Sequence, residues 1–512
     1  MTSLFTIVYV IAALFLALYG ANGLLLTWIY WRVRRRRPAE PPLTTVPMVT
    51  VQLPIYNEMH VVERLIDAVA QLDYPPDRLQ IQVLDDSTDE TTAIAQARVD
   101  YHRARGVDIV LVRRQGREGF KAGALAHGLC SARGEIIAIF DADFVPPPDF
   151  LRRTVPHFLS DPRLGFLQTR WGHLNASYSA ITRAQALALD GHFVIEQTAR
   201  QRAGWFMNFN GTAGLWRRAC IEESGGWRAD TLCEDLDLSY RAQLAGWHCA
   251  YLPHVVAPAE VPPQLAAFKR QQFRWAKGSI QCLRKLGGTV WQAKRPWPAR
   301  LQGLIHLSSY LAHPLMVIML LVTLPLLLSG VRLSWPLAYL SLASLGPPIL
   351  YAVAQKELYP DWWRRYAYMP VLVLLGSGIA FSNSVAVLQG LLGRGNSFRR
   401  TPKFRLEGKS GHWQGRRYAL ALDWTVFGEA LLALYAALTI TVAWKQGHTW
   451  AIPFLCLYLG GFGLMAAVGL WQSMGSAFLA KPRRKRSPAT RQAARPAPLA
   501  SPAVWSMSRR GN

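Results

Sequence analysis

The sequence predicts an α/β domain joined to a bundle of membrane-spanning helices. From about residue 45 to 290, short β-rich runs that end in polar residues alternate with helical patterns. This alternation is typical of a largely parallel sheet with helices on both faces. Before and after that region, apolar stretches are long enough to cross a bilayer. The 512 residues leave room for two or three such units.

The first element is an N-terminal transmembrane helix within residues 1–31. Residues 4–30 contain no charged side chain, and the basic run WRVRRRR follows them. A cleavable signal peptide carries its positive charges ahead of the apolar stretch, so we expect this segment to remain as an anchor. Because positive charges stay on the cytoplasmic side, the N-terminus is predicted outside and the α/β domain in the cytoplasm, at the plasma (inner) membrane.

The second unit, residues 45–290, contains five strand patterns: VTVQLPIYNE, LQIQVLDDSTDE, VDIVLVRR, GEIIAIFDADF and LGFLQTRW. Helical patterns such as MHVVERLIDAVAQL separate the early strands. Ligands of such sheets bind at the carboxyl ends of the strands. Polar residues at these ends are therefore expected to converge on one edge, namely Asn57, Asp85, Asp86, Asp141 and Asp143.

The third unit, residues 300–475, has the composition of a membrane region with about four spanning helices. The predicted spans are 304–329, 335–355, 424–445 and 450–474. A further apolar stretch, 367–392, is followed by a loop, 393–419, with eight Lys or Arg residues and one Glu. A span at 367–392 would place this basic loop outside, so we expect an interfacial helix there.

Charge and cysteine usage narrow the class of partner. The net charge of +25 arises from Lys and Arg residues that cluster beside apolar segments and in the Pro/Ala/Arg-rich tail, 481–512. This placement favours anionic lipid headgroups over nucleic acid. The tail is predicted to be disordered and cytoplasmic. The six cysteines lack metal-ligand or CxxC spacing and fit reduced thiols.

Asp141 and Asp143 follow an apolar strand directly, one residue apart. Such a pair can share a divalent cation with diphosphate oxygens and water. A turn acid followed by a helix cap is the alternative. The proline run at 146–148 prevents a regular helix immediately afterwards, which keeps both carboxylates in a rigid loop and favours the metal site.

Other polar residues suit the remaining parts of a nucleotide ligand. Asp85 and Asp86 suit hydrogen bonds from a nucleobase or ribose, whereas Asp89 is most simply an N-cap. Lys121 lies between small residues near a helix start and suits a phosphate, with a surface lysine as the alternative.

Gln271, Arg274 and Trp275 share one face of a predicted helix. A Trp ring beside hydrogen-bond donors is a platform for a sugar. The same pattern also fits an amphipathic helix anchored at a membrane.

The segment DTLCEDLDLSYRAQLAGW, residues 230–247, places four acids ahead of an amphipathic helix. Acids are favoured at a helix start by the backbone N–H groups and the helix dipole, so all of them could be caps. We expect Glu234 and Asp235 at the helix N-terminus, where N–H groups would lower the pKa of a carboxyl group. Asp230 and Asp237 fit loop and helix-surface positions.

Taken together, six segments resemble the processive family-2 glycosyltransferases of the cellulose synthase superfamily. They are QVLDDSTDET, FKAGAL, FDADFVPPPDFLRRTVP, FNGTAGLWR, CEDLDLS and QQFRW. Their sequences are most similar to the cellulose-synthase-like mannan and glucomannan synthase group and its bacterial relatives. The resemblance covers residues 48–290 and extends more loosely to SFRRTPKF, 397–404, which looks like a gating-loop motif. It implies an α/β catalytic domain of GT-A (Rossmann-like) mixed-sheet fold fused to an α-helical transmembrane bundle.

The resemblance also implies roles for the matching residues. Asp235 would be the general base, next to Glu234, in a motif where Cys233 replaces a threonine. Asp141 and Asp143 would hold Mg²⁺ or Mn²⁺. The donor site would comprise Asp85, Asp86, Lys121, Asp141, Arg274, Thr401 and Lys403. The acceptor site would comprise Trp275, Gln271, Asn210, Gly211 and Thr212.

The implied activity is transfer of sugar from a nucleotide-sugar donor, UDP-glucose or GDP-mannose, to a growing glycan acceptor with inversion. The product would be a β-linked polysaccharide of cellulose, β-glucan or mannan type, exported through the membrane with or without accessory export subunits. Two alternatives stay open. One is a non-processive glycolipid synthase acting on diacylglycerol, ceramide or polyprenyl phosphate. The other is a transporter or scaffold with a degenerate domain.

Overall fold

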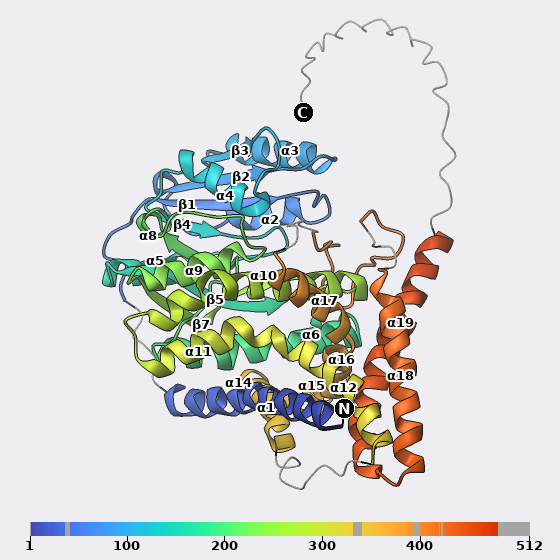
Figure 1. Cartoon of the computed structure of the whole chain (residues 1–512). Coiled ribbons are helices and arrows are strands. Elements are labelled where there is room, and N and C mark those ends of the chain that lie inside the picture. Colours follow the sequence, from blue (N-terminus) through green and yellow to red (C-terminus); the bar gives the residue numbers. More distant parts are fainter. Residues whose placement is uncertain are drawn as a thin grey trace, which may run out of the picture.

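The computed structural model describes residues 2–35, 41–330, 340–393, 400–418, 420 and 423–479. The sequence 397–399 of the gating-like motif and the tail 481–512 lie outside these residues. Within the described part, a sheet with helices packed around it lies beside the long helices α18 and α19 (Figure 1). Helices α11 and α1 run below β5 and β7 in the view of Figure 1, and α10 lies at the level of the lower part of the sheet.

A seven-stranded mixed sheet forms the centre of the domain, in the order β3-β2-β1-β4-β6-β5-β7. Strands β1 to β4 are parallel, β6 is antiparallel to both of its neighbours, and β5 and β7 run parallel to each other. The strands β1 to β7 are Val49–Ile55, Leu79–Asp85, Ile109–Arg113, Ile136–Ile139, Leu164–His173, Gly214–Arg217 and His248–Ala259. All five strand patterns of the sequence form strands, and the predicted mixed sheet is confirmed.

Two strands, β6 and β7, have no clear signal in the sequence. Strand β6 is only four residues long. Strand β7 contains Pro253 and Pro258, which are unfavourable in a central strand. It lies at the sheet edge, and its pairing with β5 shifts register between Thr169 and Arg170, so this edge tolerates the prolines.

Both faces of the sheet are buried. Successive residues of β4 alternate between two apolar clusters, with Ile136 and Ala138 in one and Ile137 and Ile139 in the other. The helices of the domain are α2 Val62–Ala70, α3 Thr91–Arg103, α4 Phe120–Ser131, α5 Phe150–Ser160, α6 Ala180–Gly191, α7 Gln197–Arg202, α8 Arg218–Glu223 and α9 Glu234–Leu244. A short π-helical turn, His192–Glu196, joins α6 to α7.

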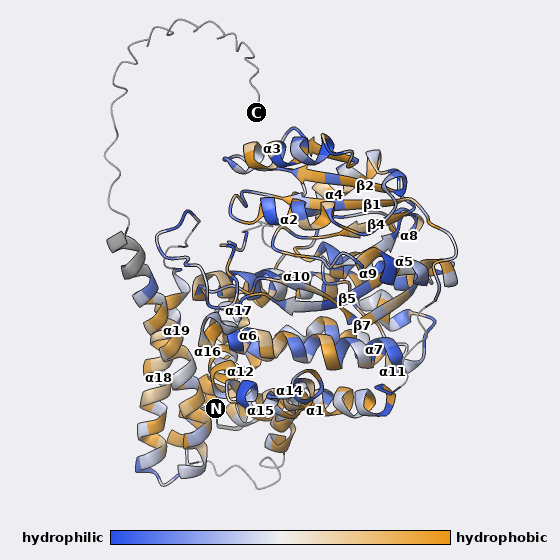
Figure 2. Ribbon diagram, turned by 180° about the vertical axis from the view of Figure 1, so that it is seen from behind, coloured by the Kyte–Doolittle hydropathy of each residue, from blue (hydrophilic) through white to orange (hydrophobic). Residues whose placement is uncertain are grey.

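The remaining helices carry most of the long apolar stretches, which are orange in Figure 2. They are α1 Thr2–Val33, α10 Leu265–Gln292, α11 Trp297–Ser308, α12 Ala312–Leu328, α14 Gly346–Leu358, α15 Trp362–Tyr366, α16 Met369–Gly378, α17 Ala380–Leu391, α18 Thr425–Lys445 and α19 Ile452–Leu479. By length and composition, four helical segments of the described part could cross a membrane: Leu4–Val33, Trp297–Leu328, Thr425–Lys445 and Thr449–Gln472. Figures 1 and 2 show α1 running crosswise to α18 and α19.

Two predicted membrane segments differ in form from the rest. The described part of 335–355 forms a 3₁₀ turn, Ser341–Leu345, and helix α14, whose 13 residues reach only about 20 Å. The stretch 367–392 forms α16 and α17, which belong to a bent pair with an angle of 44°. Such a pair is either a broken span or a re-entrant segment. Counted as one span, it would bring the candidate spans among the described residues to five.

Candidate active site

A cleft that opens to solvent lies at the carboxyl edge of the sheet. The segments after β1, β4 and β7 form one side, and the start of α9 and one face of α10 form the other. Most of the predicted site residues line this cleft. They are Asp86, Lys121, Asp141, Asp143, Asn210, Gly211, Glu234, Asp235, Gln271, Arg274, Trp275, Thr401 and Lys403.

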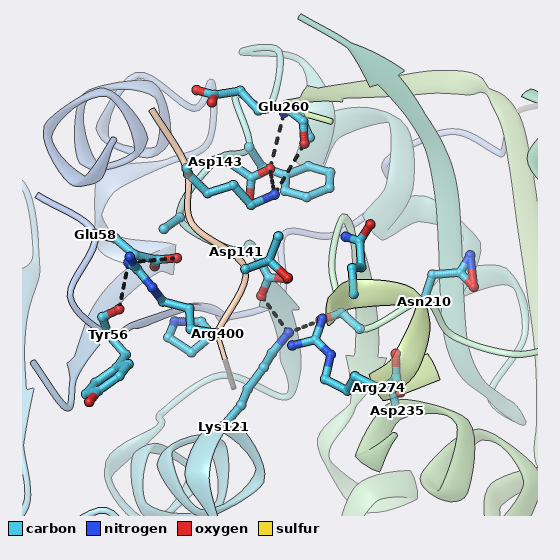
Figure 3. Close-up of a pocket in the computed structure, with 18 of the residues that line it drawn as sticks. Tyr56, Glu58, Lys121, Asp141, Asp143, Asn210, Asp235, Glu260, Arg274 and Arg400 are labelled. Atoms are coloured by element: carbon cyan, nitrogen blue, oxygen red, sulfur yellow. Dashed lines mark hydrogen bonds and ion pairs between the residues drawn. The ribbon is translucent and has the colours of Figure 1, made fainter. Parts of the chain in front are cut away.

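Asp141 is fixed by the neighbouring helix and loop. Its Oδ1 atom lies 2.5 Å from Lys121 Nζ, which also donates to the carbonyl of Gly211 at 2.8 Å. The backbone N–H of Asp141 donates to the Thr212 hydroxyl at 2.8 Å. Thr212 is buried and holds Asp141 from behind, so the structure gives it a supporting place rather than one on the cleft wall. Figure 3 shows Lys121, Asp141 and Arg274 pointing toward one another.

Asp143 is bound by a second lysine. Its Oδ2 atom accepts from Lys403 Nζ at 2.6 Å and from the backbone N–H of Glu260 at 3.2 Å. Glu260 is itself held by Arg64, whose Nη2 donates to Glu260 Oε1 at 2.8 Å. Lys403 therefore joins the loop that begins at residue 400 to the end of β4.

The Asp141 and Asp143 carboxylates fit a divalent cation. Both line the same cleft, and each forms an ion pair with a lysine ammonium. The two carboxylates therefore attract cationic groups. In the described ranges, no group of three or more His, Cys, Asp or Glu side chains could hold a metal ion. The two carboxylates would therefore share a cation with oxygens of a bound diphosphate, as Mg²⁺ commonly does.

Asp235 lies in the first turn of α9, which begins at Glu234 as predicted. Gly211 faces it closely: a Cβ atom at residue 211 would lie 2.8 Å from Asp235 Oδ2 and 3.5 Å from Lys121 Nζ. Gly211 also has φ = +81°, a backbone conformation that favours glycine. The Asp235 carboxylate therefore packs directly against Gly211, near Lys121, the lysine that binds Asp141.

The expected lowering of the Asp235 pKa is wrong. Burial and the negative charge of Glu234 raise the pKa of Asp235 to about 7. Lys121, the hydrogen bond from the Leu236 N–H and Arg274 act in the opposite direction without reversing this. One N–H at the helix start is too weak to offset the loss of solvent around a buried carboxylate.

Helix α10 supplies the opposite wall of the cleft through Gln271, Arg274 and Trp275. It packs tightly on the residue before α9. A Cβ atom at Gly278 would lie 2.4 Å from the Cys233 sulfur, so the helix needs a glycine there. Burial raises the pKa of the Cys233 thiol well above its usual value, which keeps it a neutral packing group.

The loop 400–418 lies across the same edge of the sheet. Arg400 Nη1 donates to the carbonyl of Tyr56 at 3.1 Å and lies 3.9 Å from the Glu58 carboxylate. Burial raises the pKa of Glu58 to about 7, although Arg400 favours the charged form. Thr401 and Lys403 follow on the cleft wall, as expected for a segment that covers a donor.

Asp85 and Asn57 differ from the sequence-based expectation. Asp85 Oδ1 accepts from the Ser87 N–H at 2.9 Å and Oδ2 from the Thr92 hydroxyl at 2.7 Å, so its carboxylate is used within the β2–α3 loop. The Asn57 side chain accepts from the Thr88 N–H at 2.8 Å and joins the ends of β1 and β2. Neither residue lines the cleft. Asp86 does, paired through both oxygens with Arg114.

Several cleft residues were not predicted. Tyr56 follows β1, and the Arg117 guanidinium lies 3.4 Å from the centre of its ring. Trp171 and His173 line the cleft because β5 extends as far as His173. Tyr56 and Glu58 are the neighbours of the predicted Asn57, so the expectation that ligands bind at the carboxyl ends of strands could also have identified them. Glu260 follows strand β7, which the sequence did not predict, so it could not be identified in this way.

The sheet order and the helices around it define a GT-A-like domain. The family described as "Glycosyltransferase like family 2" matches residues 47–278. This region is thus a family-2 glycosyltransferase domain, the class of hexosyltransferase that the motifs predicted. Its cellulose-synthase-like character is confirmed by the relatives below.

The chain is 43% identical over 248 residues to glucomannan 4-β-mannosyltransferase 7 of Arabidopsis thaliana, covering 48% of this chain and 45% of that protein. It is 41% identical over 273 residues to glucomannan 4-β-mannosyltransferase 1 of Oryza sativa subsp. japonica, covering 50% and 52%. The chain thus spans about half the length of these relatives. The mannosyltransferase PcManGT from Pyrobaculum calidifontis, solved with GDP-Man and Mn²⁺, shares the fold at 24% identity, with a TM-score of 0.51 and coverage of 74% and 99%.

Proposed function

We propose that this chain is a membrane-embedded, inverting and processive glycosyltransferase that builds a β-linked mannan-type polysaccharide from GDP-mannose. The observation that carries the proposal is one cleft in which Asp235 lies on Gly211 beside the Lys121–Asp141 pair, opposite Arg274 and Trp275 of α10. This arrangement supports the proposal, because a base, a diphosphate site and a sugar platform would then lie in one cleft.

The donor diphosphate would bind between Asp141, Asp143, Lys121 and Arg274. A divalent cation held by the two aspartates would neutralise charge on the diphosphate when bound. Lys121 and Arg274 favour the departing diphosphate because their fixed positive charges are already in place. Thr401 and Lys403 of the loop 400–418 would cover the donor, and Asp86 would contact the nucleoside.

Asp235 would take the proton from the acceptor hydroxyl as that oxygen attacks the anomeric carbon. The bond from that carbon to the diphosphate oxygen breaks, and a single displacement converts an α-linked donor to a β-linked product. Trp275, Gln271 and Asn210 would hold the acceptor sugar. Gly211 leaves the space in which the base and the acceptor oxygen meet.

The names of the relatives support mannose as the transferred sugar, and the Pyrobaculum neighbour was solved with GDP-Man and Mn²⁺. UDP-glucose remains the second donor to test. Helix α10, which carries Trp275, packs against α11, the start of the candidate span Trp297–Leu328, and against α19. This packing supports a polymer that grows into the membrane, with the catalytic domain on the cytoplasmic side. A glycolipid product would be a single sugar on a lipid.

The test uses membranes that contain the full chain, labelled GDP-mannose or UDP-glucose, and assays with and without Mn²⁺. We expect a long polymer that a β-mannanase degrades, formed from GDP-mannose only when Mn²⁺ or Mg²⁺ is present. Asp235→Asn should lower kcat by about 10²- to 10⁴-fold.

Asp230→Asn is the matched control, because Asp230 lies in the same segment but is 53% exposed and pairs with Lys285. It should keep normal activity. Full activity of Asp235→Asn would contradict the assignment of the base. A single-sugar lipid would replace the polymerase with the glycolipid synthase, and no transfer from either donor would contradict both.

A further inference from the structure

A buried ion pair joins helix α10 to the candidate membrane span α18. Lys269 Nζ lies 2.6 Å from Glu429 Oε1 and donates to the Thr425 hydroxyl at 2.8 Å. The two charged side chains are only 4% and 0% exposed. Glu429 lies one turn inside α18, where an ionised side chain is costly, so such residues are generally retained for a role.

The pair lies on the side of α10 away from the cleft. With about 100° of rotation per residue, Gln271, Arg274 and Trp275 lie about 120–160° around the helix from Lys269. Gly278, which contacts Cys233 next to α9, lies about 180° away. One side of α10 therefore contacts the cleft and α9, and the opposite side contacts α18.

Further hydrogen bonds join the start of α10 to Leu420, just before α18, and to helix α19. Gln264 donates to the carbonyl of Leu420 at 2.9 Å and accepts from its N–H at 3.0 Å. The Leu265 N–H donates to Gln472 Oε1 on α19 at 3.1 Å. These bonds hold the first turn, while Lys269 holds the next turn, directly before the three cleft residues.

We propose that Lys269 and Glu429 are positioning residues that fix the rotation of α10 about its axis, and thereby the aim of Arg274 and Trp275 into the cleft. The inference rests on the proposed function for the roles of these two side chains. Loss of one partner leaves a buried charge without its counter-charge, which the helix relieves by turning or shifting. A displacement of about 1 Å at a reacting group can cost about 100-fold in rate.

The experiment compares Lys269→Met, Glu429→Gln, the neutral pair K269M/E429M and the exchanged pair K269E/E429K in the full chain in nanodiscs. Two quantities are measured per folded molecule: kcat and KM for sugar transfer, and the affinity for GDP with Mn²⁺ by quenching of tryptophan fluorescence. We expect each single variant to lose about 10- to 100-fold in kcat and to bind GDP about 10-fold more weakly. The exchanged pair should recover to within about 3-fold of the original chain.

Arg34→Gln and Glu357→Gln are the controls, because this ion pair also joins two distant segments but is 32% and 39% exposed and lies away from α10. They should change neither quantity. Single variants that fold and match the original chain in kcat, KM and GDP affinity overturn the inference. If a single variant fails to fold, the neutral pair decides: unchanged kcat and GDP affinity overturn the positioning role, and a 10-fold loss at an unchanged thermal midpoint supports it.

Absence of transfer in the original chain would contradict the proposed function and not this inference. The GDP affinity of the variants still tests whether the pair sets the aim of Arg274.

Discussion

At Asp235, burial and Glu234 raise the pKa to about 7, while Lys121 and Arg274 favour the charged form. Such a base is partly protonated at neutral pH and has a high affinity for the acceptor proton. As the proposed base, Asp235 would act in its ionised form, so the rate should increase as pH rises through the pKa. In the proposed mechanism, the surroundings of this one residue would thus set the pH range of transfer.

The first prediction is that kcat/KM for transfer rises with pH along a limb with an apparent pKa near 7. Glu234→Gln removes the negative charge that raises the Asp235 pKa, so its limb should move to lower pH. The measurement is a pH profile between about pH 5 and 9. Glu222→Gln, an exposed acid paired with Arg218, should leave the limb in place. A limb that moves to higher pH in Glu234→Gln would contradict the cause given for the raised pKa.

The second prediction concerns Gly211. Gly211→Ala places a Cβ 2.8 Å from Asp235 Oδ2, which displaces the base, so we expect about a 10- to 100-fold loss in kcat. Gly204→Ala is the control, because Gly204 has φ = +69° but no atom lies within 4 Å of its added Cβ. Both variants should lose about 1 kcal/mol of folding free energy, measured by denaturant unfolding. Equal kcat in the two variants would mean that a glycine is needed at residue 211 only for its positive φ, and not for the space that Asp235 occupies.

At the scale of elements, the loop 400–418 is held to the sheet edge largely by charge. Lys403 binds Asp143, Arg400 lies near Glu58, and Phe404 N–H donates to Glu260 at 3.1 Å. Lys403 thus occupies a carboxylate oxygen that a divalent cation also needs. In the proposed site, Lys403 and a cation would therefore compete for Asp143.

The third prediction follows from that competition. Lys403→Met should raise the affinity for Mn²⁺ in the absence of nucleotide by at least about 5-fold, because Lys403 and Asp143 are only 12% and 4% exposed and their charges are little screened. Free Mn²⁺ is measured by electron paramagnetic resonance. Arg405→Met is the control, since Arg405 and Glu63 are about half exposed and 3.7 Å apart. Unchanged or weaker Mn²⁺ binding by Lys403→Met would show that the lysine does not compete.

The sequence predicted those parts of the fold and site that depend on strand ends and motif spacing. Asp86, Asp141 and Asp143 meet in one cleft because β1, β2 and β4 are parallel neighbours. Asp85 could not be distinguished from Asp86, because the direction of a side chain after a strand depends on hydrogen bonds in the loop. The raised Asp235 pKa could not be predicted either, since it arises from burial by distant segments.

At the scale of the whole molecule, α10 is one of several elements through which the sheet domain contacts the candidate membrane helices; α6 also packs on α14 and α16. Helix α10 bonds to α18 through Lys269, to α19 through Leu265, and to α17 through Arg284, whose Nη1 donates to the Gly390 carbonyl at 2.9 Å. The cleft and the apolar helices are therefore one packed unit. If the candidate spans cross a membrane, this packing would place the proposed sugar site next to the bilayer, as coupled synthesis and export would require.

The fourth prediction tests how that unit lies in the membrane. Helix α18 has 21 residues and extends about 32 Å, close to the thickness of the hydrocarbon core, and a short turn joins it to α19. If both helices span, the turn at Gln446 lies on the side opposite the catalytic domain. We expect Gln446→Cys, in a Cys456→Ser background, to react with a membrane-impermeant maleimide in intact cells.

Cys130 is exposed on the sheet domain and serves as the internal control, which should react only after the cells are permeabilised. Residues 130 and 446 are both exposed to water, so a difference in labelling would report on which side of the membrane each lies. Labelling of residue 446 only after permeabilisation would put the α18–α19 turn and the catalytic domain on one side. The hairpin would then enter and leave the same leaflet, and a glycan could not reach the far side along it.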